Sequence, residues 1–381
     1  MKKKIFLSAF LSFILIAIFS ISTIAYGESS KINARAYLVA DYYSGEIVES
    51  KNENERYPIA SMVKITTLSL VFDAINEGKL KWDDEIIVSE NAFSMGGSQA
   101  FLDCGQTYRA EELIKSVIVA SANDSCVALA EHLEGSVENF VAKMNEKAKR
   151  LNMENTNYIN CTGLPADGAY SSAKDVLIIT RELMKNDKFF DYAKVWMYDI
   201  EHSGGRTTSL TNTNKLVRFY NGMDGGKTGF TNEALSCLSC RATRGDTSLM
   251  CVVIGSPSSK ERNSTVSSLL NQGFANYENS VVVKKGDLLE DKVSVKNGKA
   301  DFVECEYGQD VKTFAKKNTP VKMQEKLEFL PLSAPIKSGD VVGYKTFYCE
   351  NGKEYRVELI AKNSIDCKVY SDFINDFAKK W

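Results

Sequence analysis

Ser61 and Lys64, a serine and a lysine three residues apart, are the pair in this sequence best suited to nucleophilic catalysis. Residues at positions i and i+3 of a helix lie on one face, so the two side chains can meet. A serine hydroxyl is a weak nucleophile until a base accepts its proton, and an uncharged lysine amine can be that base. We therefore interpret Ser61 as a candidate nucleophile and Lys64 as its base, although a helix cap followed by a surface lysine has the same spacing.

Two further strings supply groups that such a pair needs. An S-x-N string contains Ser121 and Asn123, and a K-T-G string begins at Lys227. Ser121 can relay a proton between the lysine amine and a leaving group, and the Asn123 amide can both donate to and accept from a peptide-like substrate. Lys227 can hold a substrate carboxylate. Its charge, together with burial, would lower the pKa of Lys64 and keep that amine neutral.

The K-T-G string and the residue after it are predicted to bind substrate. We expect Thr228, Gly229 and Phe230 to contact the ligand, with Gly229 leaving room for a ligand that lies against the strand. The backbone N–H groups of Ser61 and Phe230 are candidates for an oxyanion hole.

Order and setting distinguish these strings from chance matches. A second S-x-x-K string, at Ser171 and Lys174, is interpreted as a helix cap and a surface lysine. The first S-x-x-K opens a buried helix, S-x-N falls in a break between helices, and K-T-G opens a strand. A Ser-His-Asp triad is the competing design, but His132 falls in a helix, His202 in a polar loop, and no nucleophile elbow is near either histidine.

Apolar periodicity predicts the elements that would position these residues. We predict helices over residues 61–78, 111–120, 125–133, 137–151, 173–185 and 261–277. Two strands are expected around a turn within residues 34–49, and a hairpin from residues 234–243 and 248–255. Residues 211–226 are expected to be polar and turn-rich. From about residue 280 the pattern changes to short strand-like runs separated by turn residues, which indicates a small all-β domain.

Length and composition suit two globular domains. The chain has 381 residues and a formal net charge of −2, and its one dense basic block is Lys2–Lys4, so we expect no nucleic-acid partner. The nine cysteines, an odd number without a disulfide-scaffold spacing, are expected to be free and buried as small hydrophobes. Neither histidine has a partner at ligand spacing, so no metal site is expected.

The first residues are typical of a targeting segment. Lys2–Lys4 precede an apolar run from Ile5 to Ala25, and small residues at Ala25 and Gly27 suit a signal peptidase. We predict a signal peptide over residues 1–27, with an uncleaved anchor as the alternative. The protein is therefore expected to be exported, in the cell wall or on the outer face of the membrane.

The three strings in this order resemble the active sites of penicillin-binding proteins and serine β-lactamases. Residues 28–277 are similar to the D-alanyl-D-alanine carboxypeptidases, the low-molecular-mass penicillin-binding proteins of peptidase family S11. The similarity extends over residues 121–131, 140–145, 163–165, 212–216 and 225–231. It implies an α+β penicillin-binding domain, with helices packed on an antiparallel sheet, then a β-rich domain over residues 278–368 and a short amphipathic tail over residues 369–381. The chain departs from the family pattern at Cys161, which lies in a loop where a proline or another residue is expected.

The resemblance also implies the chemistry. The substrate would be the D-Ala-D-Ala end of peptidoglycan stem peptides, processed through acylation of Ser61, release of D-alanine and hydrolysis, without a cofactor. β-Lactams would be covalent inhibitors, and by position Arg262 would help to hold the substrate carboxylate. The tail places Phe377 and Trp381 on one helical face, which favours peripheral membrane contact.

Two alternatives stay open. A class A β-lactamase needs an E-x-x-L-N box, and the nearest string, Glu182–Asn186, lacks the leucine in place. The β-rich domain also has no role in that class. A non-catalytic wall-binding protein on the same scaffold would not need the intact set of Ser61, Lys64, Ser121, Asn123 and Lys227.

Overall fold

The structure is a computed structural model that describes residues 32–319, 321–350, 352–372 and 374. The predicted signal peptide, residues 1–27, lies outside the described residues, as do Phe377 and Trp381 of the tail. Within the described part of the chain, no helix is long and apolar enough to cross a membrane.

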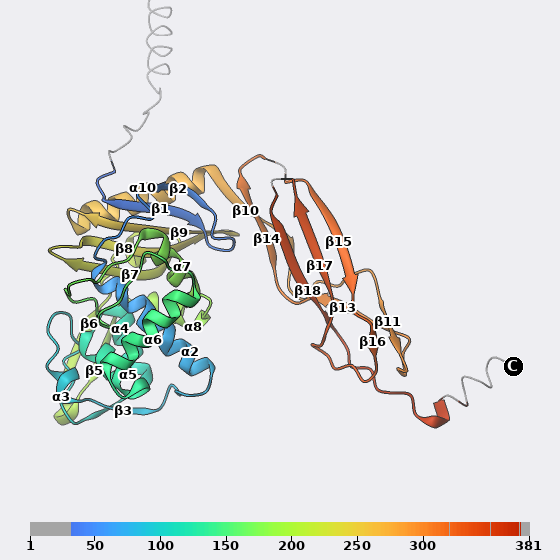
Figure 1. The fold of residues 1–381 in the computed structure, drawn as a ribbon, viewed down its shortest axis with the longest axis horizontal. Helices are drawn as coiled ribbons and strands as arrows, with labels where there is room; N and C mark the ends of the chain where they lie inside the picture. Colours follow the sequence, from blue (N-terminus) through green and yellow to red (C-terminus); the bar gives the residue numbers. More distant parts are fainter. Residues whose placement is uncertain (1–31, 320, 351, 373, 375–381) are drawn as a thin grey trace, which may run out of the picture. The chain divides into compact units, whose positions relative to one another are not determined.

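A five-stranded antiparallel sheet is the centre of the first domain (Figure 1). Its strand order is β2-β1-β9-β8-β7, so β7 lies at one edge. The strands are β1 (Ala36–Asp41), β2 (Ile47–Lys51), β7 (Met223–Thr231), β8 (Leu235–Arg244) and β9 (Thr247–Ser256). Every residue of the central strand β9 is buried, as expected for a strand that is covered on both faces.

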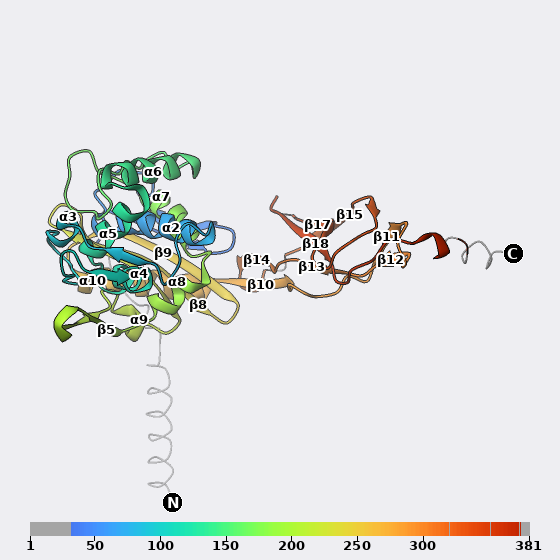
Figure 2. The same cartoon turned by 90° about the horizontal axis from the view of Figure 1, so that it is seen from below.

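Helices cover both faces of this sheet. On one face lies α10 (Ser259–Asn276), where Gly273 has no room for a side chain because a Cβ would lie 2.6 Å from Leu249 Cδ1. The other face is covered by a helical layer (Figures 1 and 2). That layer contains α2 (Lys64–Asn76), α4 (Ala110–Val119), α5 (Asn123–Glu134), α6 (Val137–Arg150), α7 (Ala173–Leu183) and α8 (Asp187–Ala193).

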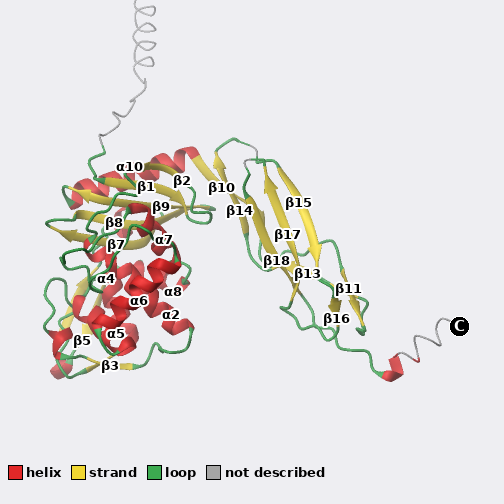
Figure 3. Cartoon of the chain, viewed as in Figure 1, coloured by secondary structure: helices red, strands yellow, loops and turns green. Residues whose placement is uncertain are grey.

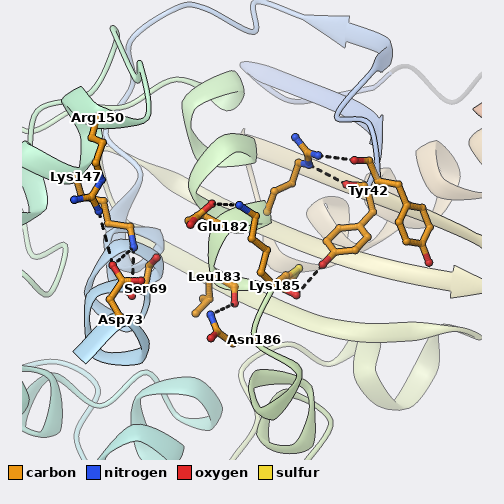
Figure 4. Close-up of polar contacts among 12 residues, drawn as sticks. Tyr42, Ser69, Asp73, Lys147, Arg150, Glu182, Leu183, Lys185 and Asn186 are labelled. Atoms are coloured by element: carbon orange, nitrogen blue, oxygen red, sulfur yellow. Dashed lines mark hydrogen bonds and ion pairs between the residues drawn. The ribbon is translucent and has the colours of Figure 1, made fainter. Parts of the chain in front are cut away.

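Helix α2 is buried over most of its circumference, which is the environment of a helix in the interior of a domain. A polar contact also fixes its position. Lys147 of α6 is 2% exposed, and its Nζ lies 2.6 Å from Asp73 Oδ2 and 3.3 Å from the carbonyl oxygen of Ser69, both on α2 (Figure 4). Arg150 lies 3.9 Å from the same carboxylate. The ion pair joins α6 to the helix that begins at Lys64.

Small elements complete the first domain. They are the 3-10 turn η1 (Ala60–Val63), α3 (Glu90–Phe93), the paired strands β3 (Glu85–Ile87) and β4 (Thr107–Arg109), η2 (Ser203–Gly205), the hairpin of β5 (Met197–Glu201) and β6 (Thr207–Thr211), and α9 (Leu216–Phe219). The β5–β6 hairpin was not predicted from the sequence.

The C-terminal part of the chain is built of strands (Figure 3). One sheet has the order β13-β18-β17-β15, from Cys305–Tyr307, Glu354–Ala361, Val341–Cys349 and Met323–Phe329. Strand β10 (Tyr277–Val283) pairs with β14 (Val311–Lys316), and β11 (Val293–Lys296) lies between β12 (Phe302–Val303) and β16 (Leu332–Ser333). The C-terminal part has an apolar core of its own, which includes Val342, Phe347, Val357 and Leu359.

The predicted α+β class with a following all-β part is confirmed. Two details were wrong. The K-T-G string lies inside β7, which begins at Met223, so the expected turn-rich segment ends earlier than predicted. All nine cysteines are free, but Cys104 and Cys367 are exposed rather than buried.

Candidate active site

Ser61 and Lys64 are in contact where η1 passes into α2. Lys64 is fully buried, and its Nζ lies 3.1 Å from Ser61 Oγ. The same nitrogen donates to the carbonyl oxygen of Thr162 at 2.5 Å. Burial disfavours the charged form and lowers the pKa of Lys64 to about 8. The Thr162 carbonyl thus holds the Lys64 amine beside the Ser61 hydroxyl. Because it is buried, this amine binds its proton less tightly than an exposed lysine does.

Contrary to our expectation, Lys227 is not among the main causes of the lowered pKa of Lys64. We expected its charge to help lower the pKa of Lys64, but burial is the leading cause, and Cys126, Cys161 and Asp124 act in the opposite direction. The repulsion between the two cations falls on Lys227, whose pKa is well below its usual value, first through burial and then through Lys64. Two buried ammonium groups that repel each other favour a state in which the pair carries one proton.

Ser121 and Asn123 contain buried polar atoms without partners. Ser121 is 3% exposed, has a positive φ of 66°, and its Oγ has no hydrogen-bond partner among the described residues. Asn123 Nδ2 donates to the carbonyl oxygen of Gly96 at 2.6 Å, while Oδ1 is unpaired within the same described residues. Buried orphan atoms and a strained backbone are costly, and they occur together mainly at functional sites. The two atoms are therefore available to a polar ligand.

The K-T-G residues lie on the edge strand β7, which packs against η1 at Gly229. Lys227 is 2% exposed and its Nζ donates to the carbonyl oxygen of Thr228 at 3.2 Å. Thr228 Oγ1 donates to Thr213 Oγ1 at 2.8 Å. Phe230 is 64% exposed. The outer edge of β7 pairs with no other strand in the described chain, so an extended peptide can add to it.

Gly229 has a packing role that was not predicted. A Cβ at this position would lie 2.5 Å from the carbonyl oxygen of Ile59 and 3.3 Å from Ala60 Cβ. The glycine is therefore required by the close approach of β7 to η1, the turn that carries Ser61. It allows the turn that carries Ser61 to pack against the strand.

Arg262 is buried on α10, and three of its five N–H donors already have acceptors within the protein. Its Nη1 donates to the carbonyl oxygen of Cys237 at 3.4 Å, and its Nη2 to Asn263 Oδ1 at 2.8 Å. Its charge nevertheless lowers the pKa of Lys227, after burial and Lys64. The structure thus places Arg262 near the cluster as a background charge.

The loop after α6 contains site residues that the sequence analysis missed. Gly163 has a φ of 79°, and a Cβ there would lie 2.1 Å from the carbonyl oxygen of Ala60 and 2.9 Å from Ser61 N. Asn160 Oδ1 accepts from Gly163 N at 2.7 Å, which fixes the turn that presents Thr162 to Lys64. The asparagine followed three residues later by glycine is a turn signal that could have indicated this role.

Asp124 was also missed. Its carboxylate accepts hydrogen bonds from the backbone N–H groups of Ala100, at 3.0 Å, and Leu102, at 3.2 Å. Together with the bond from Asn123 N to the carbonyl oxygen of Ser98, at 2.7 Å, it fixes the preceding loop on the S-x-N string.

Comparison with known proteins identifies the family. The sequence profile of the D-alanyl-D-alanine carboxypeptidases, Peptidase S11, matches residues 23–258, and that of the penicillin-binding protein 5 C-terminal domain matches residues 277–366. The chain belongs to the D-alanyl-D-alanine carboxypeptidase family. The predicted family is thereby confirmed, and this family is one of serine hydrolases.

Relatives match most of the chain. D-alanyl-D-alanine carboxypeptidase DacF of Bacillus subtilis is 39% identical over 313 residues, which cover 81% of this chain and 80% of DacF. DacC of Escherichia coli is 32% identical over 359 residues, covering 88% of this chain and 85% of DacC. The crystal structure of penicillin binding protein 5 from Haemophilus influenzae is 30% identical with a TM-score of 0.68, and the alignment covers 88% of this chain and 98% of that one.

Proposed function

We propose that the protein is a serine-type carboxypeptidase that removes the terminal D-alanine from peptidoglycan stem peptides through an acyl-enzyme on Ser61. The observation that carries the proposal is the buried Lys64 amine, 3.1 Å from the Ser61 hydroxyl and with its pKa lowered to about 8. The family membership supports the substrate class, since the relatives are named D-alanyl-D-alanine carboxypeptidases.

In the acylation step, neutral Lys64 accepts the Ser61 proton as Oγ attacks the carbonyl carbon between the two D-alanines. The N–H groups of Ser61 and Phe230 stabilise the oxyanion. Ser121 then relays the proton from Lys64 to the leaving nitrogen, the C–N bond breaks and D-alanine departs. Its hydroxyl has no other partner among the described residues to compete with this role. Water activated by the same lysine hydrolyses the ester and restores Ser61.

Recognition follows from the edge strand and its cations. The substrate adds to β7 as an extended strand, with its terminal carboxylate at Lys227 and Thr228 and its amide at Asn123. An anion beside Lys227 favours the protonated form of that lysine. Because the two lysines repel, the charge on Lys227 then favours a neutral Lys64. In this proposal, substrate binding places the one shared proton where catalysis needs it.

We also propose that β-lactams acylate Ser61, that the protein is exported by its N-terminal segment, and that its C-terminal tail contacts the membrane peripherally. These proposals rest on the sequence of residues 1–27 and 369–381 and on the family.

D-Alanine release from a D-Ala-D-Ala peptide tests the proposal. Purified protein should release one equivalent of D-alanine per peptide, and Ser61→Ala should release none. Rapid turnover of penicillin with no D-alanine release would favour the β-lactamase alternative. Neither release nor covalent labelling by fluorescent penicillin would favour a non-catalytic wall-binding protein.

A further inference from the structure

The β5–β6 hairpin has no role in the mechanism above, but its turn contacts the loop of residues 96–103, which holds Asn123. The carbonyl oxygen of Gly96 accepts a hydrogen bond from Asn123 Nδ2 at 2.6 Å, and the carbonyl oxygen of Ser98 accepts one from Asn123 N at 2.7 Å. Both the side-chain amide and the backbone of Asn123 are thus bonded to the loop. The position of the Asn123 amide therefore depends on the position of the loop.

Alternate residues of this loop bond to two different partners. The N–H groups of Ala100 and Leu102 donate to the buried carboxylate of Asp124, which follows Asn123 on α5. The residues that alternate with them, Phe101 and Asp103, bond to the hairpin instead. This part of the loop is therefore held between α5 and the hairpin.

Arg206, at the end of the hairpin turn, makes contacts with both of the alternating residues. Its Nη2 donates to the carbonyl oxygen of Phe101 at 2.7 Å and lies 2.5 Å from Asp103 Oδ1. Ser203, in the same turn, donates from its Oγ to Asp103 Oδ2 at 2.9 Å. Both oxygens of the Asp103 carboxylate are therefore bound by the hairpin turn, and hydrogen bonds to ionised groups are the strong ones.

Phe101 has a backbone conformation that needs external support. Its φ is 60°, and its side chain is 57% exposed. A positive φ is rare for a bulky residue, and such a conformation persists only where the surroundings enforce it. Because the ring is mostly exposed, packing of the ring does not provide this support. The bonds to Asp124 on one side and to Arg206 on the other provide it.

The Arg206–Asp103 ion pair is partly exposed, with 43% of the arginine side chain and 28% of the aspartate side chain accessible to solvent. Ion pairs in such positions contribute little to the stability of the fold. The pair is therefore better placed to fix the conformation of the loop than to stabilise the whole domain.

We propose that Arg206 is a positioning residue for Asn123. By holding Phe101 and Asp103, it keeps the loop, and with it the carbonyl oxygen of Gly96, where the Asn123 amide is held ready for the substrate. The proposal rests on the proposed carboxypeptidase function, in which Asn123 binds the amide of the substrate. Arg206 acts through the loop and not by contact with the reacting groups.

Two β-lactams that differ in one amide test this role. Benzylpenicillin has a side-chain amide that Asn123 can bind, and aminopenicillanic acid has a free amine in its place. In Arg206→Gln, the second-order rate constant for acylation by benzylpenicillin should fall about tenfold, because a small displacement of a binding group is costly. The rate constant for aminopenicillanic acid should stay the same. Partial unfolding, or damage to the Ser61–Lys64 pair, would instead lower both rate constants equally.

Combination with Asn123→Ala tests the route of the effect. Asn123→Ala alone should also slow acylation by benzylpenicillin. Arg206→Gln should cause no further loss when Asn123→Ala is already present, because the two changes act through one group and are not additive.

Asp199→Ala is the matched control from the same hairpin. Asp199 Oδ1 accepts a hydrogen bond from Ser209 Oγ at 2.5 Å, and this contact joins β5 to β6 without involving the loop. Acylation by both compounds should be unchanged in this variant. Thermal unfolding checks that each variant is folded, and an unfolded Arg206→Gln would show that Arg206 is needed for the fold and overturn the positioning role.

Equal losses for the two compounds in Arg206→Gln, or additive losses in the double variant, would also overturn the positioning role and leave the carboxypeptidase intact. If the unaltered protein neither reacted with either compound nor released D-alanine, the proposed function itself would be overturned.

Discussion

Lys64 Nζ lies 3.1 Å from Ser61 Oγ and 2.5 Å from the carbonyl oxygen of Thr162. One contact directs the amine at the nucleophile, and the other holds it there from a separate loop. Because the amine is buried, its proton is weakly held, and the pKa of about 8 is within reach of neutral pH.

The rate of acylation should rise with pH. Lys64 acts as a base only when neutral, and with a pKa of about 8 its neutral fraction increases about tenfold from pH 6 to pH 7. The second-order rate constant for acylation by a penicillin, measured by stopped flow from pH 5.5 to 9, should follow this increase and level off above pH 8. A flat profile between pH 6 and pH 8 would show that Lys64 is not the base.

Ser121→Ala should separate stability from activity. The substitution removes a buried hydroxyl that has no partner among the described residues, so the free energy of unfolding should rise by about 1 kcal/mol. It also removes the proposed proton relay, so acylation should slow by about 100-fold or more. Urea unfolding and penicillin labelling measure the two effects. A destabilised but fully active variant would refute the assignment.

Gly163→Ala should damage the site more than an ordinary change at a positive-φ glycine. The added Cβ would lie 2.1 Å from the carbonyl oxygen of Ala60, so the backbone beside Ser61 must move. A displacement of that kind can slow catalysis by about 100-fold.

Gly78→Ala is the matched control. It has a φ of 71° but nothing within 4 Å of the added Cβ, so it should lower stability by about 1 kcal/mol and leave acylation unchanged. Similar acylation rates for the two variants would contradict the account of Gly163.

The Lys147–Asp73 ion pair should respond unequally to removal of its two partners. Asp73→Ala leaves the buried Lys147 ammonium uncompensated and should lower the free energy of unfolding by about 3 kcal/mol. Lys147→Met leaves a carboxylate that is one-third exposed and close to Arg150, so it should cost about 1 kcal/mol. Chemical denaturation measures both, and equal losses would show that burial of Lys147 is not what makes the pair important.

The sequence predicted the elements that have a strong local signal. Helices α4, α6, α7 and α10 fall close to their expected bounds because their apolar spacing is a local feature, and α6, α7 and α10 also follow a serine cap. The β5–β6 hairpin was missed because its strands are short and largely exposed, so they lack a hydrophobic pattern.

The motifs predicted which side chains form the candidate site, but not the contacts that position them. S-x-x-K, S-x-N and K-T-G identify side chains, and the structure places Lys64 against Ser61 and Gly229 against the turn that carries Ser61. The carbonyl oxygen of Thr162, the carboxylate of Asp124 and the contact of Gly229 with Ile59 depend on tertiary packing, which no local pattern encodes. Which of the two buried lysines has its pKa lowered further depended on the charged groups around each amine, and the sequence could not supply these.

Mass spectrometry of the penicillin-treated protein tests the central claim most directly. The account predicts one β-lactam adduct per chain, located on the peptide that contains Ser61. The adduct should be absent from Ser61→Ala, reduced by about 1,000-fold in formation rate in Lys64→Ala, and unchanged in Lys174→Ala, where an exposed lysine of the second S-x-x-K string is removed. An adduct on any other residue, or equal rates for the two lysine variants, would contradict it.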